Sequence, residues 1–145
     1  MHGKLTLLIL RAPEPSLKAL ERNLAEAGFD LLVRTDLQRA HRVLQQTPQI
    51  DVVLTDTVFP WGTWLDALHT VEALAPGTPV VVCTAEHSPA LREQVRERGA
   101  YYAEMEPYYP IAVQLLIHAA LARRDHLRRS HGRLYAVLPR GDQAA

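Results

Sequence analysis

Five short apolar runs alternate along the chain with segments of helical periodicity, and this alternation constrains the fold more than any other feature. The runs are residues 4–10, 29–33, 50–55, 79–84 and 100–105. The first has the length and composition of a strand buried on both faces, and the fourth is the richest in β-branched residues. The other three are also predicted to be strands. The segments between them repeat apolar residues three and four positions apart, as on one face of a helix. Strands joined by crossovers of helical length predict a parallel sheet with helices on both faces.

Turn and capping residues mark the limits of these helices. Gly28 follows the first helical segment, and Asp36 can cap the second. Pro76-Gly77 is a strong turn signal after the third segment, and Gly99 closes the polar fourth one. In sheets of this type ligands and chemistry gather at the carboxyl ends of the strands, so the residues that follow each run are the ones to inspect.

The last helical segment is predicted to run from about residue 111 to residue 129. Four of its apolar residues are expected to pack on the sheet, namely Ile111, Leu115, Ala119 and Ala122. The tail from Gly132 onward has no clear period. We therefore expect one domain over residues 1–130 and a C-terminal tail or linker over residues 131–145.

Composition excludes several classes of protein. Lys+Arg 16 balances Asp+Glu 16, so no net charge draws the chain to nucleic acid or to an anionic membrane. The basic stretch 123–129 is too short for a nucleic-acid domain and is interpreted as a solvated helix end. Cys83 is the single cysteine, which excludes internal disulfides and thiolate zinc sites. No uncharged apolar run reaches the roughly 18 residues of a membrane span, and no secretory signal is present, so we expect a cytoplasmic protein.

Motifs at the strand ends resemble those of one signalling family. VVLTDTVFP ends the third run at Asp56, PVVVCTA ends the fourth at Thr84, and RGAYYAEMEP brackets the fifth before Pro107. In this order and spacing, over roughly residues 4 to 125, the chain resembles the receiver domain of two-component response regulators. Together with the alternation, the resemblance implies an α/β fold with a doubly wound, five-stranded parallel sheet, a flavodoxin-like (βα)5 three-layer sandwich.

The resemblance also implies roles for two residues that this sequence keeps. Asp56 takes the phospho-acceptor position, from which a working receiver attacks a phosphoryl group. Thr84 takes the position of the hydroxyl that contacts a phosphoryl oxygen. In the family, two acidic residues after the first strand hold Mg²⁺, which neutralises charge in the transition state, and a lysine before the strand-five proline contacts the phosphoryl group.

The pocket departs from the family's pattern in its first loop and after its fifth strand. Arg11 and Ala12 stand at the positions of the acidic pair, Pro13 follows them, and Glu106 replaces the lysine. Mg²⁺ prefers oxygen ligands, and Arg11 puts a positive charge in their place, so we do not expect this metal. We expect no other cofactor either. The negative charge of Glu106 is expected to repel a phosphoryl group. The repulsion energy is roughly 4 kcal/mol for unit charges about 4 Å apart at an effective dielectric of about 20. We expect a degenerate pocket in which Arg11 pairs with Asp56, Glu106 or both.

Aromatic residues near the pocket suggest contacts. Trp61 and Trp64 follow the third run and form a lid or a partner contact, unless one of them packs on the following helix. Tyr101 and Tyr102 lie on the fifth run. In receivers the face made by helix four, strand five and helix five is the usual homodimer and partner surface. The resemblance therefore implies a homodimer through the last helix and strand five.

We expect an atypical receiver domain that acts as a phosphorylation-independent signalling module through contact with another protein, and not as an enzyme. Two alternatives stay open. The first is a phosphorylatable receiver with Asp56 as acceptor and a non-standard, metal-poor site. The second is a small-molecule-binding flavodoxin-like domain, which is disfavoured because residues 11–15 do not form a Gly-rich phosphate loop.

Overall fold

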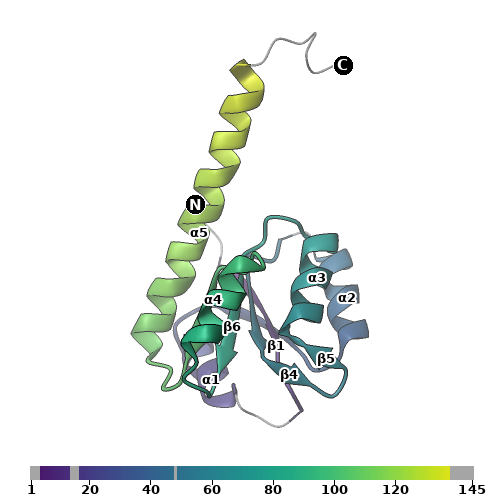
Figure 1. Cartoon of the computed structure of the whole chain (residues 1–145), viewed down its shortest axis with the longest axis vertical. Coiled ribbons are helices and arrows are strands. Elements are labelled where there is room, and N and C mark those ends of the chain that lie inside the picture. The colour runs from purple at the N-terminus through teal and green to yellow at the C-terminus, as the bar shows by residue number, and fades with distance from the viewer. Residues whose placement is uncertain (1–3, 14–16, 48, 138–145) are drawn as a thin grey trace.

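A five-stranded parallel sheet forms the centre of the computed structural model, which describes residues 4–13, 17–47 and 49–137 (Figure 1). The strands lie in the order β2-β1-β3-β6-β7, and all neighbouring pairs are parallel. Their bounds are Thr6–Leu10 for β1, Asp30–Arg34 for β2, Val52–Asp56 for β3, Val80–Thr84 for β6 and Tyr102–Met105 for β7. This sheet, with helices on both faces, confirms the predicted fold class.

Five helices cover the sheet in two layers. They are α1 (Lys18–Glu26), α2 (Leu37–Gln46), α3 (Trp64–Leu74), α4 (Pro89–Glu97) and α5 (Pro110–Val137). The buried side chains of α2, α3 and α4 belong to one core, and those of α1 and α5 belong to the core on the opposite face. In the cartoon the helices accordingly flank the strands on both sides (Figure 1).

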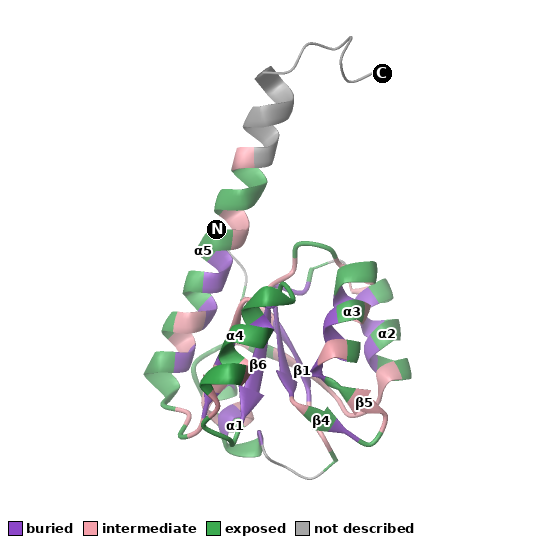
Figure 2. Cartoon of the chain, in the orientation of Figure 1, coloured by how far each residue is buried: buried purple, intermediate pink, exposed green. Residues whose placement is uncertain are grey.

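The three central strands β1, β3 and β6 are mostly apolar because each contributes side chains to both cores. In β1, Leu8 and Leu10 point into the core beneath α2 and α3, whereas Leu7 and Ile9 point into the core beneath α1 and α5. Every residue of β3 and β6 is buried (Figure 2). A strand covered on both faces shows no alternation of polar and apolar residues, which is the pattern seen in the sequence.

A small antiparallel hairpin after β3 was not predicted from the sequence, which indicated a loop. Its strands are β4 (Val58–Phe59) and β5 (Gly62–Thr63). Gly62 has a φ of 157°, and a Cβ there would collide with the carboxylate of Asp66. That carboxylate accepts the N–H of Thr63 at 2.9 Å and so completes a capping box at the start of α3. The hairpin is thus joined directly to the next helix.

The last helix differs from its prediction in length and in orientation. It runs to Val137 through Gly132, so its predicted end at residue 129 is wrong, and residues 138–145 of the predicted tail lie outside the described residues. The side chains that face the sheet are Val113, Ile117, Ala120 and Leu121. The four residues predicted to pack there are exposed instead, with Ile111 and Leu115 at 71% and 66%. Two apolar stripes run along this helix, and periodicity alone does not choose between them.

Ion pairing fixes the direction of α5 at the point where it leaves the sheet. Arg124 Nη1 lies 3.2 Å from Asp51 Oδ1, and these side chains are only 12% and 8% exposed. The other oxygen of Asp51 accepts the N–H of Thr6 at 2.8 Å. The C-terminal part of α5 extends away from the rest of the domain (Figure 1). In the described part of the chain, no helix is both long enough and apolar enough to span a membrane.

Candidate functional site

The predicted site residues meet at one edge of the sheet because the strands are parallel. Asp56 ends β3 and lies beside Cys83 in the register of β6, and Thr84 lies beside Met105 at the end of β7. Arg11 and Ala12 follow β1, whose last residue, Leu10, is paired with Thr55. The carboxyl ends of β1, β3, β6 and β7 therefore bring these side chains together.

Asp56 is a buried carboxylate, 7% exposed, that is bonded to the loop after β1. Its Oδ2 accepts the backbone N–H of Ala12 at 2.8 Å. The hydroxyl of Thr55 donates to the carbonyl of Asp56 at 3.0 Å. The bond to Ala12 uses the backbone, and it therefore holds the first loop against the third strand whatever side chain stands at position 12.

Arg11 lies against Glu21 of α1, a residue that the sequence analysis did not consider. Arg11 Nε is 3.1 Å from Glu21 Oε2, with side-chain exposures of 23% and 15%. These two atoms form an ion pair whose N–H is not well aligned for a hydrogen bond. Glu21 follows Leu20 at the margin of the apolar face of α1. The sequence showed a carboxylate beside the core, but nothing in the spacing connected it with Arg11.

Burial raises the pKa of Glu21, and the charge of Arg11 only partly offsets this. The negative charge of Asp56 also raises the pKa of Glu21, so the two carboxylates are near enough to interact. The arginine therefore stands among carboxylates at this end of the sheet. Its guanidinium supplies positive charge at a position where the receiver pattern has an acidic residue.

Thr84 and Glu106 join the ends of β6 and β7. The N–H of Glu106 donates to the carbonyl of Thr84 at 2.9 Å, and the Glu106–Pro107 peptide bond is cis. The hydroxyl oxygen of Thr84, which is 4% exposed, accepts the N–H of Glu86 at 3.0 Å. In the structure this hydroxyl therefore organises the turn that follows β6.

Two further titratable groups belong to this edge, and sequence reasoning missed one of them. Burial raises the pKa of the Cys83 thiol well above its usual value, and the charges of Asp56 and Glu104 add to the effect. Burial likewise raises the pKa of Tyr108, with smaller effects from Cys83, Glu106 and Asp56. Tyr108 thus lies near the pocket and is half-buried. The sequence contained one signal for this placement: Tyr108 is only two residues after Glu106, which was predicted to belong to the pocket.

The two tryptophans are held in place by the domain itself. Trp64 is 8% exposed and packs in the core beneath α2 and α3. Of the alternatives given for the tryptophans, packing against the domain therefore applies to Trp64. Trp61 stacks on Phe59, with ring centroids 4.1 Å apart and planes 13° apart. Its Nε1–H donates to the carbonyl of Thr35 at 2.9 Å. The hairpin is therefore attached to the junction of β2 and α2.

Tyr102 begins β7 and Tyr101 immediately precedes it. β7 is the outermost strand on the side of the sheet opposite to β2. The guanidinium of Arg92 lies 4.8 Å above the ring of Tyr102, and its Nε–H donates to the carbonyl of Ala103 at 3.2 Å. Tyr101 is half-buried against the core beneath α1 and α5. Both tyrosines are thus half-buried on the side of the molecule that carries α4 and α5.

Comparisons with known proteins identify the fold. No family model matches the sequence, and no curated protein matches it. A response regulator receiver domain protein from Clostridium thermocellum superposes with a TM-score of 0.75 at 20% identity, covering 85% of this chain and 98% of that one. The receiver domain of a sensor histidine kinase from Pseudomonas aeruginosa, with a magnesium ion coordinated in its active-site cleft, gives 0.71 at 17% identity, covering 83% and 99%.

A third structure, the beryllofluoride-activated NtrC4 receiver domain dimer, gives a TM-score of 0.72 at 20% identity and covers 82% of this chain and 98% of that one. These similarities agree with the strand order and with the layers of helices described above. At such sequence identities they show the fold alone. The chain has the fold of the response-regulator receiver domain.

Proposed function

We propose that this chain is a receiver-type signalling module that acts through protein contacts and does not take up a phosphoryl group at Asp56. The observation that supports this proposal is the loop after β1. That loop carries the guanidinium of Arg11, 3.1 Å from Glu21, and only the methyl group of Ala12 at the next position. A receiver that works by phosphorylation requires carboxylates in this loop.

The residues at this edge do not suit Mg²⁺. That ion takes oxygen ligands in near-octahedral geometry, whereas positions 11 and 12 offer a guanidinium and a methyl group. One oxygen of Asp56 already accepts a backbone N–H. The described residues contain no group of three or more His, Cys, Asp or Glu side chains that could hold a metal ion. We therefore assign no step of the function to a metal.

Charge at the end of β7 supports the same proposal. Phosphoryl transfer depends on positioning and on neutralising the negative charge of the transferred group. Glu106 follows β7 and adds negative charge to an edge that already contains Asp56 and Glu104. The guanidinium of Arg11 is already paired with Glu21, so without a cation at position 106 and without a metal an incoming phosphoryl group meets net repulsion.

Intact-mass spectrometry tests the proposal directly. Folded protein incubated with a small phosphodonor and Mg²⁺ should gain no phosphoryl group, with Asp56→Asn as the matched control. A gain that disappears in Asp56→Asn would contradict the proposal. It would favour the second candidate, a phosphorylatable receiver, which the burial of Asp56 at the end of β3 also allows.

Restoring the receiver pattern gives the complementary experiment. The triple variant Arg11→Asp, Ala12→Asp and Glu106→Lys returns two oxygen ligands and one cation to the edge. We expect it to accept a phosphoryl group in a Mg²⁺-dependent manner, and the same variant carrying Asp56→Asn should not. A folded triple variant that remains unmodified would show that charge is not what prevents phosphorylation.

We further propose that the contact surface is the outer face of α5 together with β7, and that it binds a second copy of the chain. Tyr109, Ile111 and Leu115 are 65%, 71% and 66% exposed. Ile111 and Leu115 lie on α5 and Tyr109 lies just before it, and exposed apolar side chains gathered in this way mark interaction sites. β7 is an edge strand of the sheet. One solved structure with this fold is a receiver domain dimer.

Sedimentation velocity over a range of concentrations tests the dimer. We expect Leu115→Gln to dissociate it, whereas Val58→Gln should leave it intact. Val58 is a matched control because it is 65% exposed and lies on the hairpin rather than on α5. A wild-type chain that is monomeric throughout, or equal loss of the dimer in both variants, would contradict this part of the proposal.

A further inference from the structure

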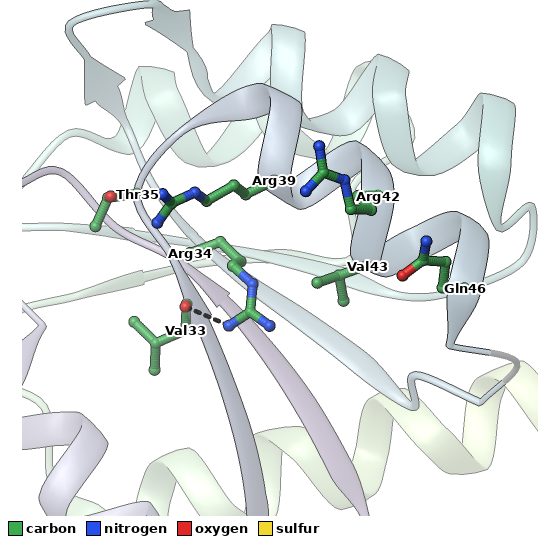
Figure 3. A pocket seen from close by; sticks show the side chains of 7 residues that line it. All are labelled: Val33, Arg34, Thr35, Arg39, Arg42, Val43 and Gln46. Carbon is green, nitrogen blue, oxygen red and sulfur yellow. Dashed lines mark hydrogen bonds between the residues drawn. The ribbon is translucent and has the colours of Figure 1, made fainter.

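Two adjoining hollows lie at the junction of β2 and α2, and arginine side chains line both. The first has a volume of about 360 Å³, and Figure 3 shows its lining. The second has a volume of about 540 Å³ and is bounded on one side by Trp61. Arg39 and Arg42 line both hollows, and Arg34 lines the first. Ligand sites of proteins commonly have volumes of about 300–1,000 Å³.

The fold places these arginines from two directions. Arg39 and Arg42 are three residues apart on α2 and therefore lie on one face of that helix. Arg34 ends β2, and its Nη1–H donates to the carbonyl of Val33 at 2.7 Å, which holds the guanidinium beside the end of the strand (Figure 3). Arginine side chains thus reach the junction both from the edge strand β2 and from the helix α2.

Positive charge is concentrated here although the chain as a whole has a formal net charge of +0. Among the described residues that line the two hollows, three are arginines and one, Asp36, is acidic. Asp36 caps α2 through the N–H of Arg39 at 2.7 Å and lies 3.4 Å from Arg39 Nε. Arg39 and Arg42 repel each other, and a bound anion relieves that repulsion. Guanidinium groups bind phosphate in a bidentate manner, which makes arginine suited to this anion.

We infer that this junction binds a small phosphate ester, with the phosphate between Arg39 and Arg42 and the organic part beside Trp61. The indole is held rigid by stacking on Phe59 and by its hydrogen bond to Thr35. It therefore offers a fixed aromatic wall to a planar group such as a nucleobase. This inference does not depend on the phosphorylation state of Asp56 or on dimerisation.

Nitrogen-15 spectra of the full chain, at constant ionic strength, test the site with three probes: AMP, inorganic phosphate and adenosine. AMP should shift the Trp61 indole N–H signal and the amides of residues 34–42 in a saturable way. Phosphate should shift only the amides, and adenosine should shift neither. Trp64 is an internal reference because its side chain is packed in the core.

Arg42→Gln should weaken AMP binding about tenfold or more, since it removes one charge-assisted contact to phosphate. Arg39→Gln provides a second variant. Arg22→Gln is the matched control, because Arg22 is also exposed but lies on α1, which covers the opposite face of the sheet. Circular dichroism confirms that each variant is folded.

Three results would overturn the inference. The first is the absence of saturable shifts with AMP at millimolar concentration. The second is an equal loss of affinity in Arg22→Gln, which would indicate a general charge effect. The third is tighter binding of a single-stranded oligonucleotide with shifts that extend to Arg123 and Arg128 on α5, which would indicate a nucleic-acid surface instead.

Discussion

Replacing Arg124 with methionine probes how α5 is attached to the sheet. Arg124 Nη1 lies 3.2 Å from Asp51 Oδ1, with the side chains 12% and 8% exposed. Asp51 Oδ2 accepts the N–H of Thr6, so this carboxylate connects the start of β1 with the last helix. Methionine keeps the apolar stem of the arginine but leaves the charge of Asp51 buried without its cation.

The structure gives the size of the expected effect. Unit charges 3.2 Å apart attract by about 5 kcal/mol at an effective dielectric of about 20. The cost of burying both charges offsets much of this attraction, yet removing one partner of a buried pair costs about 3–5 kcal/mol. Asp51 keeps its hydrogen bond to Thr6, and the second partner of Arg124, Asp125, is 47% exposed and can turn to water. We therefore expect a loss of about 3 kcal/mol.

Urea unfolding followed by circular dichroism measures this loss. With a slope of about 2 kcal/mol per molar urea, the midpoint should fall by about 1.5 M. Arg128→Met is the matched control, because Arg128 is exposed one turn further along α5, and it should change the free energy of unfolding by less than about 0.5 kcal/mol. Adding Asp51→Asn to Arg124→Met should recover part of the stability, since no buried charge then lacks a partner. An Arg124→Met protein within about 0.5 kcal/mol of wild type would refute the reasoning and leave the apolar face of α5 as its sole attachment.

Two further predictions concern the pKa values at the strand ends. Burial raises the pKa of Glu21 above its ordinary value of 4.5, so the folded state holds this proton more tightly than the unfolded chain does. The free energy of unfolding of the wild type should therefore fall relative to Glu21→Gln as the pH rises from 4.5 through the raised pKa, and parallel curves in urea titrations would contradict this. Burial also raises the pKa of Cys83, which is 1% exposed, so a thiol reagent at mildly alkaline pH should label the unfolded chain and spare the folded one. Rapid labelling of native protein would show that the strand opens readily.

Much of the fold followed from local patterns. The continuous apolar runs predicted β3 and β6 because strands covered on both faces lack alternation. Asp36 was predicted to cap the second helix, and its side chain accepts the N–H of Arg39. These features depend on residues near one another in the chain, and the sequence therefore contains the information directly.

Features that depend on distant contacts were missed. The two-residue strands β4 and β5 are too short to carry a periodic signal, and they are supported by the stacking of Trp61 on Phe59 and by the cap of α3. The last helix has apolar residues on more than one face, and the sheet selects the face that contains Val113 and Ile117. Local propensity does not report which of two apolar stripes meets the core.

The candidate site divides in the same way. The sequence by itself determined that Asp56, Thr84 and Glu106 stand at neighbouring strand ends, because parallel strands that alternate with helices all end at one edge of the sheet. Only the tertiary structure decided that Arg11 lies against Glu21 and that Arg34 joins the arginines of α2. Charge acts through space over a few ångströms, and the fold decides which charged side chains that lie five to ten positions apart in the sequence come near one another.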